Sequence, residues 1–278
     1  MTLVAVITGG AGGMGLATAK VVGQDHHVVL CDVRQDRLNQ AAATLDDLGI
    51  SVTAVNCDVR DSAAVAELFG TASSLGILAS VIHTAGVSPS MGDAEYVMTV
   101  NASGTVVVNE AFHAVAHEGA AIVNVASMAA HMLPDEIIPT AMFPTALTDA
   151  DGFVKTMLDT CSMAPEEARS GFSYALSKSF VKWYSASQCE RFNAKGLRIV
   201  SVSPGSIETE MGLLEAEAGA GAMVADAAVP RWGKAEEMAD LLAFCASAKA
   251  GYLTGTDILN DGGVIASMRE RARVAALS

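Results

Sequence analysis

A tyrosine and a lysine four residues apart, Tyr174 and Lys178, are the side chains in this sequence best suited to proton transfer. They open a segment of helical character that runs to Arg191, and a spacing of four places both on one face of a helix. A free phenol has a pKa of about 10 and is a weak base at neutral pH, but a nearby ammonium favours the phenolate. The spacing therefore predicts a general acid/base with a tuned pKa, and a helix that carries both residues by chance is the alternative.

Two other polar residues occupy positions where chemistry is possible. Ser127 follows the apolar run 120–126, where its hydroxyl either donates to a substrate oxygen as negative charge develops or caps a helix. Asn101 lies in an otherwise apolar helical segment, where an amide is costly unless its hydrogen bonds are satisfied. A functional amide and a satisfied core amide fit this position equally.

The second feature is a glycine-rich loop near the start of the chain, Thr8-Gly9-Gly10-Ala11-Gly12-Gly13-Met14-Gly15. It follows the apolar run 3–7 and precedes a helical stretch, so its free backbone N–H groups and the helix dipole suit a pyrophosphate. Asp32 ends the next apolar run, near the spacing of about 20 residues expected of a ribose ligand. These features predict a dinucleotide site; a turn that only packs a strand on a helix is the alternative.

Seven short apolar runs, separated mostly by amphipathic stretches, must position these residues: 3–7, 27–31, 52–56, 77–83, 120–126, 197–203 and 256–260. This alternation predicts a single-domain α/β fold, a Rossmann-like doubly wound parallel sheet of about seven strands. Ligands of such sheets bind beyond the carboxyl ends of the strands. The residues at or just after those ends are Asp32, Asp58, Ala85, Gly86, Ser127, Pro204 and Gly205.

Two segments interrupt this alternation. Residues 128–173 are rich in Met, Ala and Pro, with a short helix expected between Asp149 and Cys161, and residues 210–230 are rich in Gly and Ala. We expect the first to be a lid-like insertion and the second a substrate loop, both overhanging the carboxyl edge of the sheet. The domain is expected to span 1–266, followed by a C-terminal tail, 267–278, whose arginines form a solvated helix face or a subunit arm.

Composition narrows the classes of partner. A net charge of −14 argues against nucleic acid, and no apolar run approaches the roughly 18 residues of a membrane-spanning helix, although 51% of the residues are apolar. No export signal is visible in residues 1–20, so we expect a soluble cytoplasmic protein. The five cysteines are odd in number and lie mostly in apolar segments, which is typical of reduced thiols, and no residue set has the spacing of metal ligands.

Taken in order, these motifs resemble the short-chain dehydrogenase/reductase family from Leu3 to about Gly263. The family's loop pattern T-G-x-x-x-G-x-G is matched by Thr8, Gly9, Gly13 and Gly15, with Met14 inside it, and its catalytic Asn, Ser, Tyr and Lys by Asn101, Ser127, Tyr174 and Lys178. The resemblance places further cofactor contacts at Asp58 and Val59 on the adenine side, at Ala85 and Gly86, and at Pro204, Gly205, Ile207 and Thr209 near the nicotinamide.

The resemblance also implies a mechanism. Tyr174 would be the general acid/base, and Lys178 would lower its pKa and hold the ribose hydroxyls. Ser127 would position the carbonyl or alcohol, and Asn101 would hold a water that relays protons. Hydride would pass between the nicotinamide and the substrate carbon, so the cofactor carries the difficult step.

Three departures from the family pattern stand out. The usual Asn-Asn-Ala-Gly is His83-Thr84-Ala85-Gly86, which removes the second Asn side chain. Only 14 residues separate Gly86 from Asn101, so the helix between them is short or merges with the next one. The 46 residues between Ser127 and Tyr174 exceed the family's usual short loop and lie beside helices that members commonly use to form tetramers, so we expect a homodimer or homotetramer.

The cofactor and reaction follow from these residues. The Asp32 carboxylate suits the ribose hydroxyls and repels a 2′-phosphate, which favours NAD over NADP, whereas Arg34 and Arg37 are the counter-argument. We expect NAD-dependent interconversion of a secondary alcohol and a ketone, on a hydrophobic small molecule because the first insertion is apolar. An NADP-dependent carbonyl reductase and a non-catalytic dinucleotide-binding sensor or scaffold are the alternatives.

Overall fold

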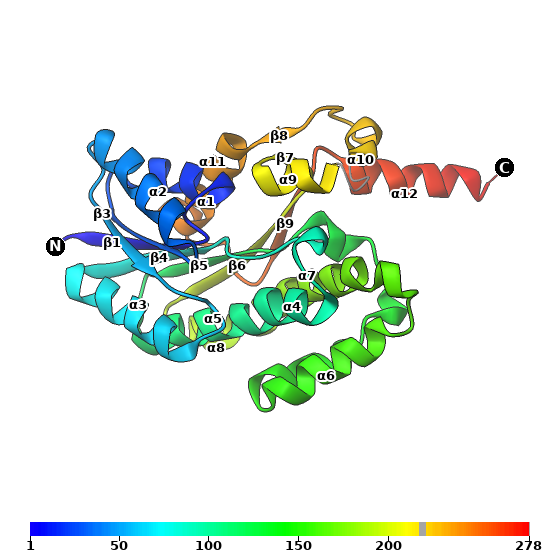
Figure 1. Ribbon diagram of the computed structural model, residues 1–278, viewed down its shortest axis with the longest axis horizontal. Helices are drawn as coiled ribbons and strands as arrows, with labels where there is room; N and C mark the ends of the chain where they lie inside the picture. The colour runs from blue at the N-terminus through cyan, green and yellow to red at the C-terminus, as the bar shows by residue number, and fades with distance from the viewer. Residues whose placement is uncertain (217–220, 278) are drawn as a thin grey trace.

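Seven parallel strands form the central sheet in the order β3-β2-β1-β4-β5-β6-β9 (Figure 1). A computed structural model describes residues 1–216 and 221–277 of the chain. The strands are β1 (Leu3–Thr8), β2 (His27–Asp32), β3 (Val52–Asn56), β4 (Ile77–His83), β5 (Ala121–Val125), β6 (Arg198–Pro204) and β9 (Asp257–Asn260). All seven apolar runs of the sequence form strands, and the predicted Rossmann-like doubly wound sheet is confirmed.

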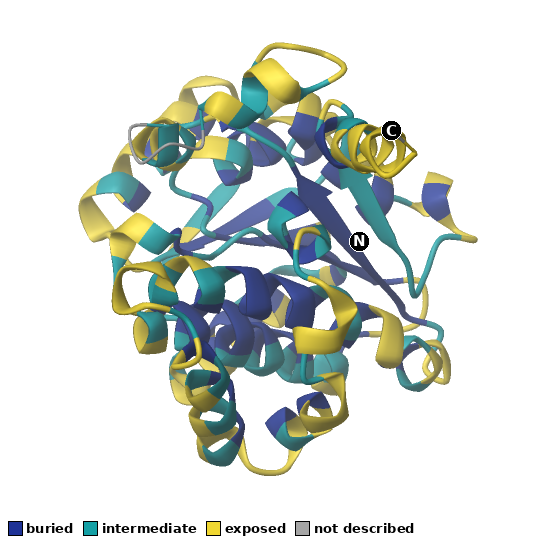
Figure 2. Cartoon of the chain, turned by 90° about the vertical axis from the view of Figure 1, so that its right-hand side faces the viewer, coloured by how far each residue is buried: buried dark blue, intermediate teal, exposed yellow. Residues whose placement is uncertain are grey.

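Helices cover both faces of the sheet (Figure 1). The helices α1 (Gly13–Val22), α2 (Gln35–Asp47) and α11 (Ala235–Ala246) pack on one face. The opposite face carries α3 (Ser62–Leu75), α4 (Ala94–Met98), α5 (Gly104–Val115), α7 (Arg169–Ser187) and α8 (Cys189–Asn193). Strands β5 and β6 are buried along their whole length, as expected of parallel strands covered on both sides (Figure 2).

The register brings the carboxyl ends of the strands to one edge. Thr8 at the end of β1 lies beside His83 at the end of β4, and Asp32 at the end of β2 lies beside Asn56. Because the strands are parallel, the loop that follows each of them leaves the sheet at this same edge. The glycine loop, Ser127 and the segment after Pro204 therefore share one rim.

The short stretch before Asn101 confirms the predicted merging of helices. Helix α4 is five residues long and continues through a π-helical turn, Thr99–Ser103, directly into α5. Asn101 is the central residue of this π turn. Such turns are rare inside α-helices and frequently mark functional sites, since the extra residue re-aims a side chain.

The segment 128–173 folds into 3₁₀ turns and one α-helix. The turns are Met128–His131, Asp135–Ile137, Thr140–Leu147 and Glu166–Ala168, and α6 spans Ala150–Cys161. Asp149 caps α6 as expected, since its side chain accepts the N–H of Gly152 at 3.0 Å. Helix α7 begins at Arg169, five residues before the start that the sequence predicts at Tyr174.

Helix α6 does not lie over the carboxyl edge of the sheet, where we expected a lid. It packs on α4 and α7, on the side away from the sheet (Figure 1), and Phe143 and Phe153 of this segment are fully buried. Their rings pack against Phe180 of α7 at centroid distances of 5.3 and 4.8 Å. We expected all of 128–173 to overhang the rim. Part of it packs on the helix layer instead, because its aromatic side chains are buried against α7.

The second irregular segment does lie at the rim. It contains α9 (Glu210–Glu215) and α10 (Ala222–Asp226), and it is flanked by β7 (Ile207–Glu208) and β8 (Gly233–Lys234), which pair with each other. Residues 217–220 of the expected substrate loop lie outside the described part of the chain. A Cβ on Gly13 would lie 3.2 Å from Cγ2 of Thr209, so this segment contacts the glycine loop directly.

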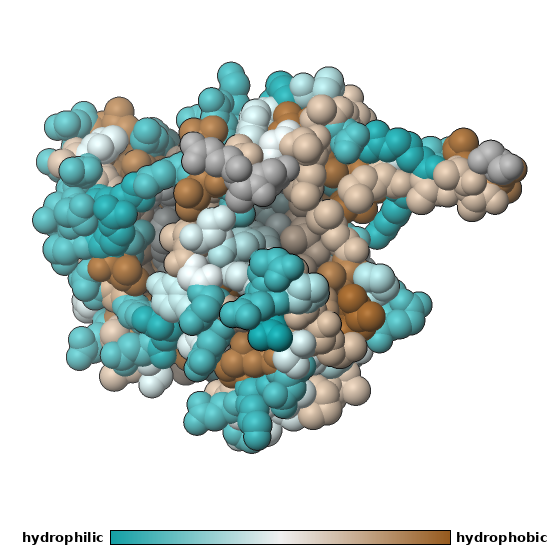
Figure 3. Space-filling model, turned by 45° about the vertical axis from the view of Figure 1, so that its right-hand side comes forward, coloured by the Kyte–Doolittle hydropathy of each residue, from teal (hydrophilic) through white to brown (hydrophobic). Residues whose placement is uncertain are grey.

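The C-terminal segment is helical. Helix α12 (Val264–Ala275) extends away from the body of the molecule and is mostly exposed (Figures 1, 2 and 3). The domain boundary that we placed after residue 266 falls inside this helix. Within the described residues, no helix has both the length and the apolar character needed to cross a membrane.

Candidate active site

The glycine loop is shaped so that side chains are excluded from it. Gly9 has a φ of 65°, and a Cβ there would lie 2.8 Å from Cα of Ala85. A Cβ on Gly15 would lie 2.3 Å from the carbonyl oxygen of Gly9. Helix α1 begins at Gly13, so its first N–H groups point toward this bare backbone. The cradle fits the pyrophosphate that the sequence predicts there.

Asp32 lies beside the loop, at the end of β2. One carboxylate oxygen accepts the N–H of Ala11 at 3.3 Å, and the other accepts the N–H of Arg34 at 3.1 Å. These bonds fix the carboxylate next to the glycine loop, where the ribose ligand is expected. Asp32 is only partly buried, so its remaining lone pairs are open to a ligand.

Asp58, which we expect on the adenine side, is hydrogen-bonded within the chain. Its carboxylate accepts hydrogen bonds from Nε and Nη2 of Arg60, at 3.0 and 2.6 Å. The Arg60 guanidinium also lies 5.1 Å from the ring centroid of Tyr96. Hydrogen bonding with the Arg60 side chain is the main reason that the pKa of Asp58 is lowered. The neighbouring Val59 is buried, 3% exposed, and packs in the core below.

Thr84 stands where the family pattern has its second Asn, and its side chain forms a hydrogen bond to the end of β1. Its hydroxyl donates to the carbonyl oxygen of Thr8 at 2.7 Å, which joins the ends of β1 and β4. A Cβ on Gly15 would also lie 2.8 Å from the Thr84 hydroxyl, so the loop, the strand and this side chain are closely fitted. Hydrogen bonding to the glycine loop is thus retained at this position.

His83 is buried between two threonines, and their bonds fix its tautomer. Thr105 already donates to the carbonyl of Asn101 at 2.7 Å, so His83 Nε2, 3.1 Å away, must carry the proton and donate to it. Nδ1 then accepts from the Thr8 hydroxyl at 2.7 Å, and that hydroxyl accepts the N–H of Ala85. Burial, and then the charge of Lys178, lower the pKa of His83 to about 3, so the ring is neutral.

The candidate catalytic residues converge where β5 ends against α7. Lys178 is 6% exposed, and its Nζ donates to the carbonyl of Val125 at 2.9 Å while lying 5.8 Å from the ring centroid of Tyr174. Ser127 follows β5 by two residues, and its side chain is within hydrogen-bonding reach of the Tyr174 phenol. Ser127 also accepts the N–H of Ala129 at 3.2 Å, so both alternatives for it, substrate positioning and helix capping, fit this geometry.

Burial dominates the titration of both groups. It raises the pKa of Tyr174 above its ordinary value, against the lowering effect of the Ser127 hydrogen bond and with a smaller raising effect from the Glu215 carboxylate. Burial alone lowers the pKa of Lys178 to about 8. This direction is opposite to the lowering of the Tyr174 pKa that we expected from Lys178, because burial dominates. At neutral pH the phenol holds its proton, ready to be donated to a carbonyl oxygen.

Asn101 has every side-chain atom engaged. Its Oδ1 accepts the N–H of Val87 at 2.9 Å, and its Nδ2 donates to the carbonyl of Val87 at 3.0 Å and to the Ser177 hydroxyl at 3.3 Å. A Cβ on Gly86 would lie 3.1 Å from Oδ1 of Asn101 and 3.4 Å from Nζ of Lys178. Asn101 is thus a satisfied core amide that also lies close to the Lys178 ammonium.

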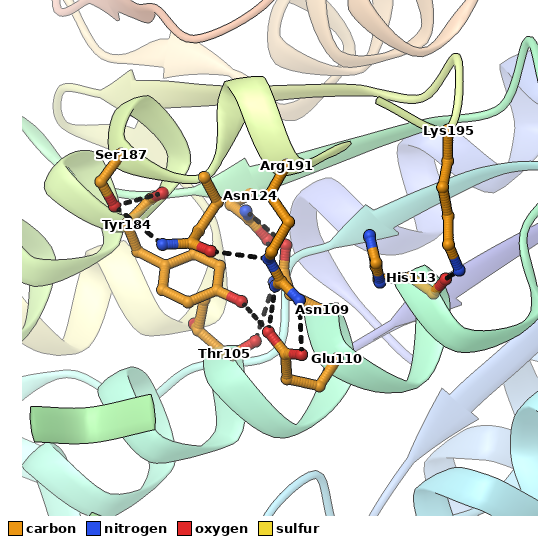
Figure 4. A network of polar contacts seen from close by, with 10 residues as sticks. Thr105, Asn109, Glu110, His113, Asn124, Tyr184, Ser187, Arg191 and Lys195 are labelled. Atoms are coloured by element: carbon orange, nitrogen blue, oxygen red, sulfur yellow. Dashed lines mark hydrogen bonds and ion pairs between the residues drawn. The ribbon is translucent and has the colours of Figure 1, made fainter. Parts of the chain in front are cut away.

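Thr105, whose hydroxyl donates to the carbonyl of Asn101, is also part of a polar network (Figure 4). Asn109 and Asn124 exchange two hydrogen bonds at 2.9 and 3.1 Å, and Asn109 also donates to the carbonyl of Thr105. Tyr184 donates to Glu110 at 2.7 Å, and Arg191 forms an ion pair with the same carboxylate. These bonds join α5, β5 and α7, so they hold the helices that carry the candidate catalytic residues.

The segment expected at the nicotinamide closes the other side of the rim. Pro204 ends β6, and a Cβ on Gly205 would lie 2.6 Å from Cα of Asp261, so this turn also tolerates only glycine. Gly205 and Ile207 line a cavity of about 170 Å³. The cavity is bounded as well by residues of the 224–238 segment and of the turn after β9, and Tyr174 does not line it.

Sequence reasoning missed four residues that help to build the rim. His83 was noted only as a departure from the family motif, and Ser177 gave no signal beyond its position next to Lys178. Glu210 and Glu215 lie on α9, whose placement depends on long-range contacts: Glu215 accepts the N–H of Ser90 at 3.0 Å. All five cysteines are free, and no group of three or more metal-ligating side chains occurs in residues 1–216 and 221–277.

Known proteins share this architecture. A family model described as short chain dehydrogenase matches residues 3–139, and one described as Enoyl-(Acyl carrier protein) reductase matches residues 154–265. The short-chain dehydrogenase/reductase bsc3 of Alternaria brassicicola is 32% identical over 92% of this chain and 94% of its own length. Dehydrogenase/reductase SDR family member 4 of Bos taurus is 28% identical over 95% of this chain and 88% of its own length.

Solved structures share the fold. A short-chain dehydrogenase/reductase from Serratia marcescens BCRC 10948 superposes with a TM-score of 0.75 at 24% identity, covering 94% of this chain and 97% of the other. A short chain dehydrogenase from Burkholderia cenocepacia J2315 in complex with NADP gives a TM-score of 0.74 at 24% identity, covering 94% and 96%.

The fold and the relatives together place the chain among the dinucleotide-dependent oxidoreductases of the Rossmann type. The chain belongs to the short-chain dehydrogenase/reductase family, as the Alternaria relative and the first family model establish. It is an NAD(P)-dependent enzyme that acts on a small molecule.

Proposed function

We propose that this enzyme uses NAD to interconvert a secondary alcohol and a ketone, with Tyr174 as the general acid/base. The observation that supports this most directly is the meeting of Tyr174, Ser127 and Lys178 where β5 ends. A proton donor, a hydroxyl within its reach and an ammonium on the same helix form the arrangement that proton transfer to a carbonyl oxygen requires.

Each residue has a defined part in the proposal. Ser127 orients the substrate oxygen toward Tyr174, whose phenol donates its proton in ketone reduction and whose phenolate accepts one in alcohol oxidation. Lys178, fixed to the Val125 carbonyl, holds its positive charge beside the phenol and faces the ribose hydroxyls. Asn101 fixes the backbone of Val87 and thereby the wall next to Lys178. When bound, the nicotinamide supplies the hydride acceptor or donor.

The substrate side of the rim favours a hydrophobic molecule. Met211, Leu213 and Leu214 of α9 are 36%, 51% and 41% exposed, and Met91 of the neighbouring 3₁₀ turn Pro89–Met91 is 47% exposed. Helix α9 contacts that turn, so these side chains lie near one another at the rim. Activity across a series of ketones should rise with apolar size; an increase with polarity instead would contradict this part of the proposal.

NAD is the proposed cofactor because Asp32 presents a carboxylate where the ribose hydroxyls bind, next to Ala11 of the loop. An NADP-dependent carbonyl reductase remains the second candidate, supported by the proximity of the Arg37 guanidinium to Gly12. We also propose a cytoplasmic homodimer or homotetramer, for which sedimentation analysis of the purified protein is the direct measurement.

The experiment that tests the proposal separates binding from turnover. NADH and NADPH are titrated into the unmodified protein, Tyr174→Phe and the control Tyr252→Phe, whose ring is fully exposed. We expect all three proteins to bind NADH and only Tyr174→Phe to lose ketone reduction. Binding without turnover on any ketone would favour the sensor or scaffold, and no binding of either nucleotide would overturn the proposal.

A further inference from the structure

We propose that Glu210, on the substrate-side helix α9, helps to select NAD by occupying the arginine that a 2′-phosphate would need. This inference rests on the proposed NAD-dependent function and adds a residue from outside the nucleotide-binding half of the fold. The charged groups around the end of β2 carry it.

Arg37 is the cation placed to meet a 2′-phosphate. It lies in the first turns of α2, and its Nη1 is 3.9 Å from the position that a Cβ on Gly12 would occupy. Asp32 lies on the same side of the loop, bonded to Ala11. A phosphate on the ribose held by Asp32 would therefore come within reach of the Arg37 guanidinium.

Arg37 already has an anionic partner on helix α9, Glu210. Its Nη2 forms an ion pair with the Glu210 carboxylate, whose side chain is 71% exposed while that of Arg37 is 33% exposed. Arg34, the other arginine near the ribose, lies 3.5 Å from Asp36. Both cations are thus paired with carboxylates, and a doubly charged phosphate would have to displace Glu210 while approaching Asp32.

The position of Glu210 is set by the helix that it begins. Thr209 caps α9 by accepting the N–H of Gly212 at 3.1 Å, and it packs against Gly13. At the other end of α9, Glu215 accepts the N–H of Ser90 at 3.0 Å. Helix α9 is therefore attached to α2 through Glu210 and to the far wall through Glu215, and a phosphate that captures Arg37 releases one of these attachments.

The test compares Glu210→Gln with the control Glu208→Gln, which removes an exposed carboxylate two residues earlier. Dissociation constants of NADH and NADPH are measured at low salt for both variants and the unmodified enzyme. We expect Glu210→Gln to bind NADPH about fivefold more tightly relative to NADH, a size typical of an exposed ion pair, and Glu208→Gln to change neither.

A double variant assigns the effect to Arg37. In Arg37→Ala/Glu210→Gln the gain in NADPH affinity should disappear, because the freed guanidinium is the group that binds the phosphate. An unchanged ratio of the NADPH and NADH dissociation constants in Glu210→Gln, or a gain in NADPH affinity that persists in the double variant, would overturn this inference. The proposed function would stand in either case, as long as the enzyme binds NADH. If the unmodified enzyme binds neither nucleotide, both proposals are overturned.

Discussion

The side chain of Lys178 is fixed to the carbonyl of Val125, with 2.9 Å between Nζ and the oxygen. This bond joins α7 to the carboxyl end of β5, two residues before Ser127, so one strand end positions both the ammonium and the hydroxyl. From there Nζ lies 5.8 Å from the ring centroid of Tyr174. Burial outweighs the other influences on the phenol and raises its pKa, which favours the protonated acid.

The pH dependence of the two reaction directions should differ for this reason. Because the pKa of Tyr174 is raised above its ordinary value, ketone reduction should be constant through neutral pH, where the phenol is protonated. Alcohol oxidation needs the phenolate and should keep rising into the alkaline range. The measurement is kcat/KM against pH in each direction, which reports the free enzyme. An oxidation rate that reaches its plateau below pH 7 would contradict the prediction.

Replacing Lys178 by Met should separate activity from stability. Burial lowers the pKa of Lys178 to about 8, so keeping the ammonium charged at pH 7 opposes folding. We expect Lys178→Met to lose turnover yet to unfold at the same or higher urea concentration, with a gain of up to about 1 kcal/mol at pH 7. Lys195→Met, on an exposed lysine, is the control. A clear loss of stability in Lys178→Met would show that the Val125 bond outweighs the desolvation.

The strands and the start of α6 could be predicted from the sequence because they depend on residues that are neighbours in the chain. The seven apolar runs are strands, and Asp149 caps α6, since a short apolar run and a capping residue are both short-range features. The residues expected at the rim also lie there, because parallel strands place their carboxyl ends together.

Long-range packing decided the rest. The course of 128–173 depends on Phe143 and Phe153 meeting Phe180 of α7, a contact that no local pattern encodes. The two interpretations of Asn101 could be weighed only once its partners Val87 and Ser177 were known, because these lie 14 and 76 residues away in the chain. The same holds for the pair of Arg37 with Glu210.

Asp32 provides a direct test of the ribose contact. Asp32→Ala removes a charged acceptor next to Ala11, so we expect the Kd of NADH to rise about tenfold, the value of one hydrogen bond to a charged group. Asp47→Ala, an exposed carboxylate at the end of α2, should leave the Kd unchanged. Equal NADH affinity in Asp32→Ala and the unmodified enzyme, measured by fluorescence titration, would remove Asp32 from the cofactor site.

His83 should make stability depend on pH. Its pKa in the folded protein is about 3, below the unfolded value of about 6.5, so the unfolded state binds more protons between these values. The stabilisation is complete above pH 6.5 and is lost as the pH falls, by about 2 kcal/mol at pH 5. Urea unfolding at pH 7 and 5 measures this loss. The loss of stability between pH 7 and 5 should be smaller in His83→Gln but unchanged in His117→Gln, which replaces an exposed histidine. Equal losses in the unmodified enzyme and both variants would refute the assignment of this pH dependence to His83.

Phe153 distinguishes a structural insertion from a lid. The side chain is fully buried against Phe143 and Phe180, so Phe153→Ala should lower the free energy of unfolding by about 3 to 5 kcal/mol. Phe244→Ala, at a phenylalanine that is 46% exposed, should cost much less. Because α6 packs on the side of α7 away from the sheet, kcat/KM of the folded Phe153→Ala enzyme at low temperature should stay within about twofold of the unmodified enzyme. A larger fall in kcat/KM while the variant remains folded would mean that this segment acts on the site, as a lid does.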